Sequence, residues 1–159
     1  MSDTAGRSGR FFEDFRAGDI YEHGMGRTVT TTDNVWFTLL TMNQNPIHLD
    51  HEYARHTEFG RPLVNSTLTL AIVTGLSVKD LSQNAVNLGW ERVRLPAPLF
   101  EGDTLYARTE ILDVRESRSR PHMGVVRARS VGYQQDGRVV LECERAVLVF
   151  KREHAPARG

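Results

Sequence analysis

The sequence has no net charge and a single cysteine, and each of these shortages argues against a class of protein. Lysine plus arginine and aspartate plus glutamate number 20 each in the 159 residues. Without an excess of positive charge, the chain lacks the field that favours binding to nucleic acid or to an anionic membrane. The one cysteine, Cys143, excludes an internal disulfide, and its apolar surroundings in the sequence favour core packing over nucleophilic chemistry.

Membrane-spanning runs and shifts in composition are also missing. The uncharged run 66–78 (STLTLAIVTGLSV) has thirteen residues, which is too short to cross a bilayer. The first ten residues contain no apolar stretch of the kind found in signal peptides. We therefore expect a cytoplasmic protein with no membrane or nucleic-acid partner. A single domain is predicted over residues 11–152, between disordered tails at 1–10 and 153–159.

A short polar stretch, residues 43–50 (NQNPIHLD), follows a helical pattern. In that pattern apolar residues recur at helical spacing behind Asp33, a good N-cap residue, so a helix is predicted to end near Asn43. These apolar residues are Val35, Trp36, Leu39 and Leu40. Pro46 fixes a turn and pushes the residue before it into an extended conformation. His48 is therefore predicted to project from a rigid bend, which can aim an imidazole.

The rest of the chain predicts one long helix and several strands. The run 66–78 is apolar nearly all round, which is typical of a helix buried on all sides. Strand patterns cover residues 90–95, 104–114, 125–133 and 138–150. The last two are joined at Asp136-Gly137, a favoured hairpin pair. The sequence thus predicts an α+β fold in which an antiparallel sheet wraps round a central helix. Such a sheet has open edges, so we expect a homodimer or a higher homo-oligomer.

The order of residues 43–73 (NQNPIHLDHEYARHTEFGRPLVNSTLTLAIV) resembles the hydratase signature of the MaoC-like enoyl-CoA hydratase/dehydratase family, whose members have the hot-dog fold. The family pattern runs Asp-x-Asn-Pro-x-His-x-Asp, then Tyr-Ala, then Phe-Gly-Arg. It is matched by Asn45, Pro46, His48, Asp50, Tyr53, Ala54, Phe59, Gly60 and Arg61. The resemblance covers about residues 11–151. It implies a single hot-dog domain and a hydro-lyase that adds water to, or removes it from, an acyl-CoA, with no cofactor besides the coenzyme A thioester substrate.

The resemblance also assigns catalytic roles. In the family, an aspartate and a histidine hold the water that adds across the double bond. His48 matches the histidine, whereas Asn43 stands at the aspartate position, and an amide can only orient the water. A lost general base typically costs ~10²–10⁴-fold in rate. The enolate oxygen formed in such a reaction needs fixed donors, for which we expect the backbone N–H groups of Ser66 and Thr67 at the start of the central helix.

Further residues are expected to contact the substrate. They are Asn45 and Asn65, beside the motif, and Arg118 and Arg120 in the loop 115–121 (RESRSRP), where three arginines form either a solvated turn or a cradle for phosphate or carboxylate. Within the resemblance, the residue order of this loop and of the segment NSTLTLA is more similar to family members that act on short, branched or dicarboxylic CoA esters, of the mesaconyl or itaconyl type, than to those that act on medium-chain fatty acids.

Several alternatives remain open at this stage. Asp50 or Glu58 could replace the missing carboxylate, although a solvated acid or a helix cap is the commoner role of each. A metal at His48, Asp50 and His51 is disfavoured because adjacent residues rarely point at one ion. Two other functions fit the resemblance: a hot-dog acyl-CoA thioesterase, which places a carboxylate early in the central helix, and a non-catalytic acyl-CoA-binding protein that has lost its base at Asn43.

Overall fold

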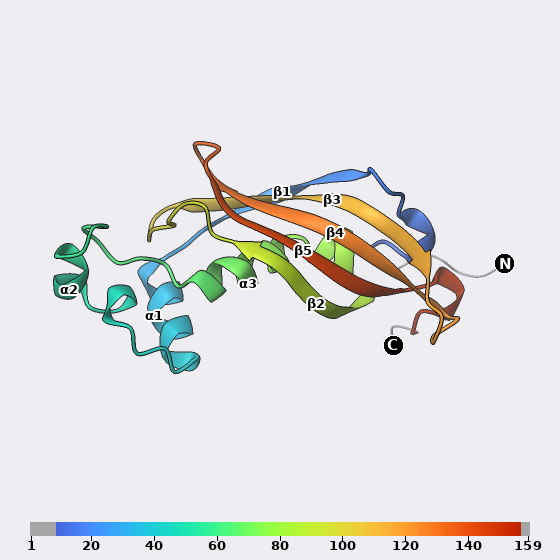
Figure 1. Cartoon of the computed structure of the whole chain (residues 1–159), viewed down its shortest axis with the longest axis horizontal. Coiled ribbons are helices and arrows are strands. Elements are labelled where there is room, and N and C mark those ends of the chain that lie inside the picture. Colours follow the sequence, from blue (N-terminus) through green and yellow to red (C-terminus); the bar gives the residue numbers. More distant parts are fainter. Residues whose placement is uncertain (1–8, 157–159) are drawn as a thin grey trace.

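The computed structural model describes residues 9–156, whose five strands form one antiparallel sheet in the order β1-β3-β4-β5-β2 (Figure 1). The strands are β1 (Ile20–Thr28), β2 (Ala85–Arg94), β3 (Thr104–Glu116), β4 (Met123–Gln134) and β5 (Val139–Phe150). The helices are α1 (Thr31–Leu40), α2 (His51–Arg55) and α3 (Ser66–Leu76), with short helical turns η1 (Phe12–Asp14), η2 (Pro46–His48), η3 (Val78–Ser82) and η4 (Arg152–His154). Most of the predicted N-terminal tail and the end of the C-terminal tail lie outside the described residues.

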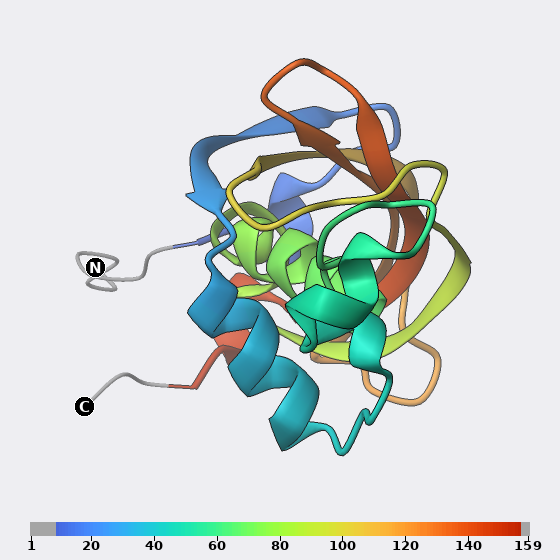
Figure 2. The same ribbon diagram turned by 90° about the vertical axis from the view of Figure 1, so that its left-hand side faces the viewer.

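The sheet curls round α3, as the α+β prediction required (Figures 1 and 2). Side chains of β3 alternate, and Leu105, Ala107 and Ile111 on its inner face are buried. Gly137 has a positive φ of 85° in the β4–β5 turn, which is the conformation that the Asp-Gly pair favours. The predicted strand at 90–95 is part of β2, which begins five residues earlier, at Ala85. Local patterning therefore predicted the sheet well.

Cys143 lies on β5 inside the main core cluster, as expected. It packs there with residues of α3 and β3, among them Val73 and Leu105. Burial raises the pKa of the Cys143 thiol, which keeps it protonated and unreactive at neutral pH. This cysteine is a packing residue.

The central helix differs from the prediction in length and in burial. It ends at Leu76, and the chain continues as the turn η3 instead of as helix to residue 78. Leu68, Thr69 and Val73 face the sheet and are buried, whereas Thr67 and Ala71 are exposed. The expectation of a helix covered on all sides was wrong for the single chain, because the sheet of one chain wraps only one side of α3. The apolar opposite side is left open.

Helix α1, which precedes residues 43–50, places two polar residues against the core and most of its apolar residues on the surface. Its N-cap is Thr30, and Asp33 is the third residue of a capping box, with reciprocal bonds of 3.1 and 2.8 Å. The buried residues of α1 are polar, Asn34 and Thr38. The apolar residues face outward, with Trp36 75% exposed and Leu40 81% exposed. The predicted period was correct, but these exposed residues do not pack against the core of their own chain, whereas the half-buried Phe37 does.

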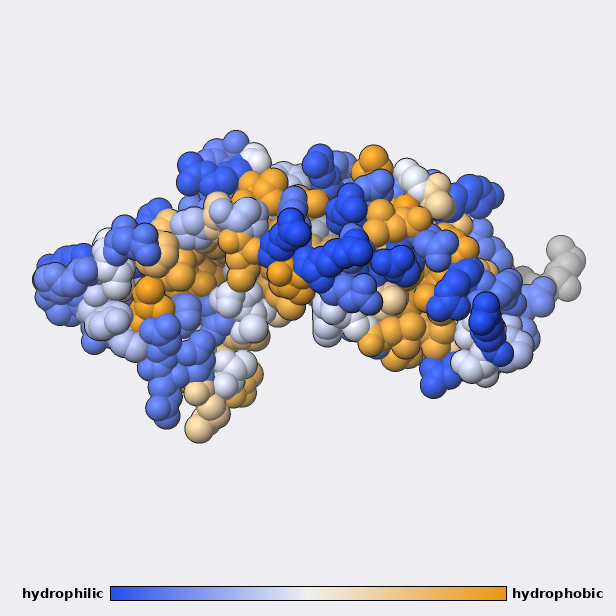
Figure 3. Space-filling model, viewed as in Figure 1, coloured by the Kyte–Doolittle hydropathy of each residue, from blue (hydrophilic) through white to orange (hydrophobic). Residues whose placement is uncertain are grey.

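Apolar side chains reach the surface along β2 as well. In the space-filling view they gather over the lower edge of the sheet, where β2 lies in Figure 1 (Figure 3). Val86, Leu88 and Trp90 are each between 43% and 53% exposed. Because β2 is an edge strand, this surface also offers unpaired backbone groups. No helix within residues 9–156 is long and apolar enough to span a membrane.

Candidate active site

The bend that contains His48 is built by the three residues before it. Asn45 caps the turn η2 by accepting the N–H of Ile47 at 3.2 Å. Pro46 follows as the first residue of the turn, where its fixed φ is favourable and its missing N–H costs nothing. The predicted rigid bend is therefore present. His48 is its last residue and is buried, with 7% of its surface exposed.

The ring of His48 is held in one tautomer. Its Nδ1 lies 2.7 Å from the carbonyl oxygen of Leu63, and because a carbonyl only accepts, Nδ1 carries the hydrogen. The other nitrogen, Nε2, has no hydrogen-bond partner among the described residues. A neutral imidazole in this tautomer presents a basic lone pair at Nε2, which is the arrangement a proton-transfer residue requires.

The start of α3 lies beside this ring in sequence and in space. Leu63, which binds the His48 ring, precedes α3 by three residues, and Asn65 is the N-cap of the helix. The Asn65 side chain accepts the N–H of Thr67 at 3.0 Å. Of the two predicted oxyanion donors, the Thr67 N–H is therefore already engaged. The Ser66 N–H has no partner among the described residues and remains available for an oxyanion.

A cavity of about 270 Å³ opens next to Ser66. Its walls come from the start of α3, from the segment before α3 and from the loop between β2 and β3, and include Phe59, Leu63, Ser66, Thr69, Pro96 and Pro98. These walls are mostly apolar. His48 does not itself line the cavity and is joined to it through Leu63. An apolar cavity at a helix N-terminus suits an acyl group whose carbonyl oxygen becomes negatively charged.

Asn43 lies on the same loop but is partly engaged. Its Oδ1 accepts the N–H of Asn45 at 3.0 Å, whereas its amide N–H₂ group has no partner among the described residues and can meet a water or a substrate. The left-handed residue that ends α1 is Met42, with φ 58°, and not Asn43. The backbone N–H of Asn43 caps α1 by donating to the carbonyl of Thr38 at 3.0 Å. Its side chain therefore stabilises the bend and does not cap the helix.

Arg118 and Arg120 lie far from His48 in the same chain. They belong to the loop between β3 and β4, at the opposite end of the sheet from α1 and α2 (Figure 1). With 13 residues in β3 and a rise of ~3.3 Å per residue, the two ends of this strand are roughly 40 Å apart. The loop lines a surface cavity together with Leu88 of β2. One chain does not bring these arginines to its own His48.

The sequence reading missed three residues that support the site: Asn34, Thr38 and Glu101. The Asn34 side chain contacts the carbonyls of His48 and Leu63, and Glu101 contacts Asn34 from the turn before β3. Thr38 accepts a hydrogen bond from Asn65 at 3.1 Å. The available signal was the spacing of two polar residues four apart in a predicted helix, which was outweighed by the apolar residues around them.

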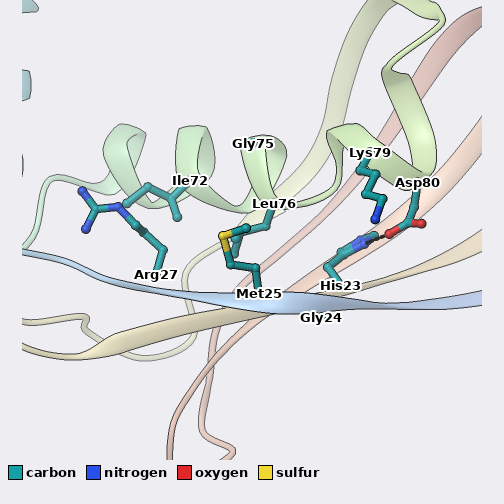
Figure 4. A pocket seen from close by; sticks show the side chains of 9 residues that line it. All are labelled: His23, Gly24, Met25, Arg27, Ile72, Gly75, Leu76, Lys79 and Asp80. Carbon is teal, nitrogen blue, oxygen red and sulfur yellow. Dashed lines mark hydrogen bonds and ion pairs between the residues drawn. The ribbon is translucent and has the colours of Figure 1, made fainter. Parts of the chain in front are cut away.

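A second, larger cavity of about 650 Å³ lies between β1 and the C-terminal part of α3 (Figure 4). Its buried His23 is engaged at both nitrogens, with Asp80 at 2.9 Å and Thr109 at 2.8 Å. Thr109 is in turn 2.9 Å from Ser130. Both nitrogens of His23 are therefore used in a hydrogen-bond network that connects η3 to the sheet. His48 is the histidine whose geometry suits proton transfer.

Comparison with known proteins agrees with this geometry. The sequence model of the family described as a MaoC-like domain matches residues 14–133, which is more than half of the chain. The chain belongs to this family. It is 36% identical over 149 residues to a mesaconyl-CoA hydratase of Cereibacter sphaeroides and 37% identical over 151 residues to a β-methylmalyl-CoA dehydratase of Chloroflexus aurantiacus. The alignments cover 93% and 94% of this chain, and the predicted family membership is confirmed.

Members of the MaoC-like family that match this chain include proteins with about twice its length. The two relatives are each covered over 43% of their own length. Among solved structures, a conserved hypothetical protein from Mycobacterium tuberculosis, described as a double hotdog fold, superposes with a TM-score of 0.82 at 23% identity. The match covers 94% of this chain and 47% of that one, so the chain has the fold of one hot-dog unit.

Proposed function

We propose that this MaoC-like chain is a hydratase/dehydratase that adds water reversibly to the double bond of a short 2-enoyl-CoA. One observation carries the proposal. The ring of His48 is fixed through Nδ1 to the carbonyl of Leu63, a residue that lines the cavity at the N-terminus of α3, and its Nε2 has no partner among the described residues. The function of the relatives supports the same chemistry, and because this chain spans about half their length, it is a proposal for the chain.

In the hydration direction, each atom of the water has a place. His48 Nε2 takes one proton from the water, and the hydroxyl adds to the β-carbon of the enoyl group. The negative charge passes to the thioester oxygen, where the Ser66 N–H and the positive end of the α3 dipole stabilise it. The proton held by His48 then returns to the α-carbon. Asn43 orients the water through its free amide N–H₂ group.

The substrate class follows from the relatives' names and from the size of the cavity. Mesaconyl-CoA and β-methylmalyl-CoA are both CoA esters of branched, dicarboxylic acyl groups, and a cavity of about 270 Å³ suits a short acyl group better than a long one. We therefore assign the chain a short, branched or dicarboxylic enoyl-CoA, with no further cofactor.

Two copies of the chain would complete the site. The relatives are about twice as long as this chain, and the double hotdog fold that it resembles holds two such units in one chain. The described residues form one unit, with an unpaired β2 edge and open apolar faces on α1 and α3. Antiparallel pairing of β2 with β2 of a second copy about a two-fold axis turns the partner's β3–β4 loop toward the end of the sheet that holds His48. Arg118 and Arg120 would then bind the phosphates or carboxylate of a substrate held by the other copy.

The test is a direct assay on the purified chain. A panel of short 2-enoyl-CoAs, with and without a second carboxylate, is followed by loss of the enoyl-thioester absorbance, and a thiol reagent is run in parallel. We expect loss of absorbance without release of free thiol. Thiol release instead would assign the chain to the thioesterases, although α3 has no acidic residue in its first turn to support that chemistry. No reaction with any ester would leave an acyl-CoA-binding protein.

Restoring the family aspartate tests the role of Asn43. Asn43→Asp keeps an oxygen that can accept the Asn45 N–H, so the bend should fold unchanged. In the proposed enzyme His48 already transfers the proton, and we expect no large gain in kcat. A parent that is inactive on every ester, with hydration appearing only in Asn43→Asp, would identify a binding protein that lacks a base, since a recovered general base is worth ~10²–10⁴-fold. The measurement is kcat and KM for both proteins.

A further inference from the structure

Two polar side chains occupy the buried face of α1, where an amphipathic helix ordinarily places apolar residues. Asn34 and Thr38 lie four residues apart and share one face, and both have no exposed surface. Burying polar groups is unfavourable unless they are hydrogen-bonded. The contacts of these side chains therefore indicate what the fold gains from them.

The carboxamide of Asn34 joins four separate points of the chain. Its Nδ2 lies 3.1 Å from the carbonyl oxygen of His48, 3.2 Å from that of Leu63 and 3.1 Å from Oε1 of Glu101. Its Oδ1 accepts the backbone N–H of Asn65 at 2.9 Å. Only this orientation of the amide places the nitrogen toward three acceptors and the oxygen toward a donor.

Each of these contacts touches a part of the catalytic arrangement. The carbonyl of His48 belongs to the residue whose ring transfers the proton, and the carbonyl of Leu63 holds that ring at Nδ1. The N–H of Asn65 belongs to the cap of α3, one residue before the oxyanion donor Ser66. Thr38 supports the same cap through the Asn65 side chain. Glu101 orients Asn34 and is itself held by Thr31 at 2.7 Å.

We propose that Asn34 is a positioning residue for the hydratase reaction, which holds the His48 bend and the N-terminus of α3 at the spacing that the substrate requires. The proposal rests on the proposed function of the site. Asn34 does not itself contact the substrate, since its four partners use its amide and its side chain is buried. Its effect is on the alignment of the proton-transfer group with the oxyanion donor, and an error of about 1 Å in such an alignment can cost ~10²-fold in rate.

The test replaces Asn34 by its isostere in Asn34→Asp. The new carboxylate can still accept the Asn65 N–H, but it turns lone pairs toward the carbonyls of His48 and Leu63 and toward Glu101. We expect kcat to fall by about 10²-fold with little change in KM, because the alignment is lost while the substrate contacts remain. Nitrogen NMR of the labelled imidazole, without substrate, should show His48 leaving the single Nδ1–H tautomer.

Because Asn34→Asp places two carboxylates together and could lower stability, the double variant Asn34→Asp/Glu101→Gln is measured beside it. The introduced glutamine offers an N–H to the introduced aspartate and removes the repulsion, but the N–H of Asn34 that reached the carbonyls of His48 and Leu63 is still missing. We expect the double variant to recover thermal stability without recovering kcat or the tautomer. Thr109→Val is the matched control: it removes the hydrogen bonds of a fully buried side chain remote from the site and should leave kcat unchanged.

Two outcomes overturn the proposal: recovery of both stability and kcat in the double variant, which shows a role in folding alone, or an unchanged kcat and unchanged ring signals in Asn34→Asp. A parent that hydrates none of the enoyl-CoAs refutes the proposed function instead. The imidazole spectra of parent and variants still decide the positioning role in that case, since they are recorded without substrate.

Discussion

Replacing His48 is expected to lower the rate of hydration by at least ~10²-fold, because the site then has no group that can accept and return the proton. The most informative change is His48→Asn. Its amide nitrogen can occupy the place of the ring Nδ1 and keep the hydrogen bond to the carbonyl of Leu63, while nothing replaces Nε2. kcat and KM are measured on the short enoyl-CoA that the parent turns over fastest, together with the melting temperature of each protein.

His48→Ala and His51→Ala complete this series. His48→Ala removes the bond to Leu63 as well, so it should lose as much activity as His48→Asn and also some stability, because His48 is buried. His51 lies three residues further along the chain and is exposed, so His51→Ala should behave as the parent does. Turnover at the parent rate in a folded His48→Asn would exclude His48 as the proton-transfer residue.

The parts of the site that could be predicted are those fixed by local chemistry. Pro46 and Asn45 determine the bend through the fixed φ of proline and through a side-chain cap, and both effects act within three residues. The turn at Asp136-Gly137 is local in the same sense, because glycine is the residue that adopts the positive φ at low cost. Such features need no knowledge of the rest of the chain.

The parts that were missed depend on contacts between distant segments. The apolar period of α1 predicts a helix with one apolar face, but not whether that face meets the core of its own chain or lies on the surface. Trp36 is exposed, and Asn34 is buried because the carbonyls of His48 and Leu63 need a donor there. In the same way, uniform apolarity predicted that α3 is covered, but not that its own sheet covers only one side.

The open faces of α1, α3 and β2 have a common explanation if two copies of the chain associate. Exposed apolar surface of this extent is unfavourable in an isolated domain and is typical of an interface. The open side of α3 presents small residues such as Ala71 and Gly75, which allow a second helix to approach closely. In the proposed dimer, a second copy would supply both the cover that the apolar faces lack and a second unit like that of the double hotdog structure.

Ala71→Glu is expected to abolish this association and, with it, most of the hydratase activity. Ala71 is exposed in the middle of α3, and glutamate favours helix about as well as other straight-chain residues, so the single chain should still fold. In an interface, however, each copy would bury an unpaired carboxylate, and removing a charge from water without a partner costs several kcal/mol.

We expect the parent to sediment as a dimer and Ala71→Glu as a monomer. Hydration at low substrate concentration should fall by ~10²-fold or more, because Arg118 and Arg120 of the second copy no longer hold the substrate against His48. Ala17→Glu is the matched control, since it introduces the same change at an exposed alanine near the opposite, β1 edge of the sheet and should leave both mass and rate unaltered. A monomeric parent, or a monomeric Ala71→Glu that hydrates as fast as the parent, would show that one chain completes the site by itself.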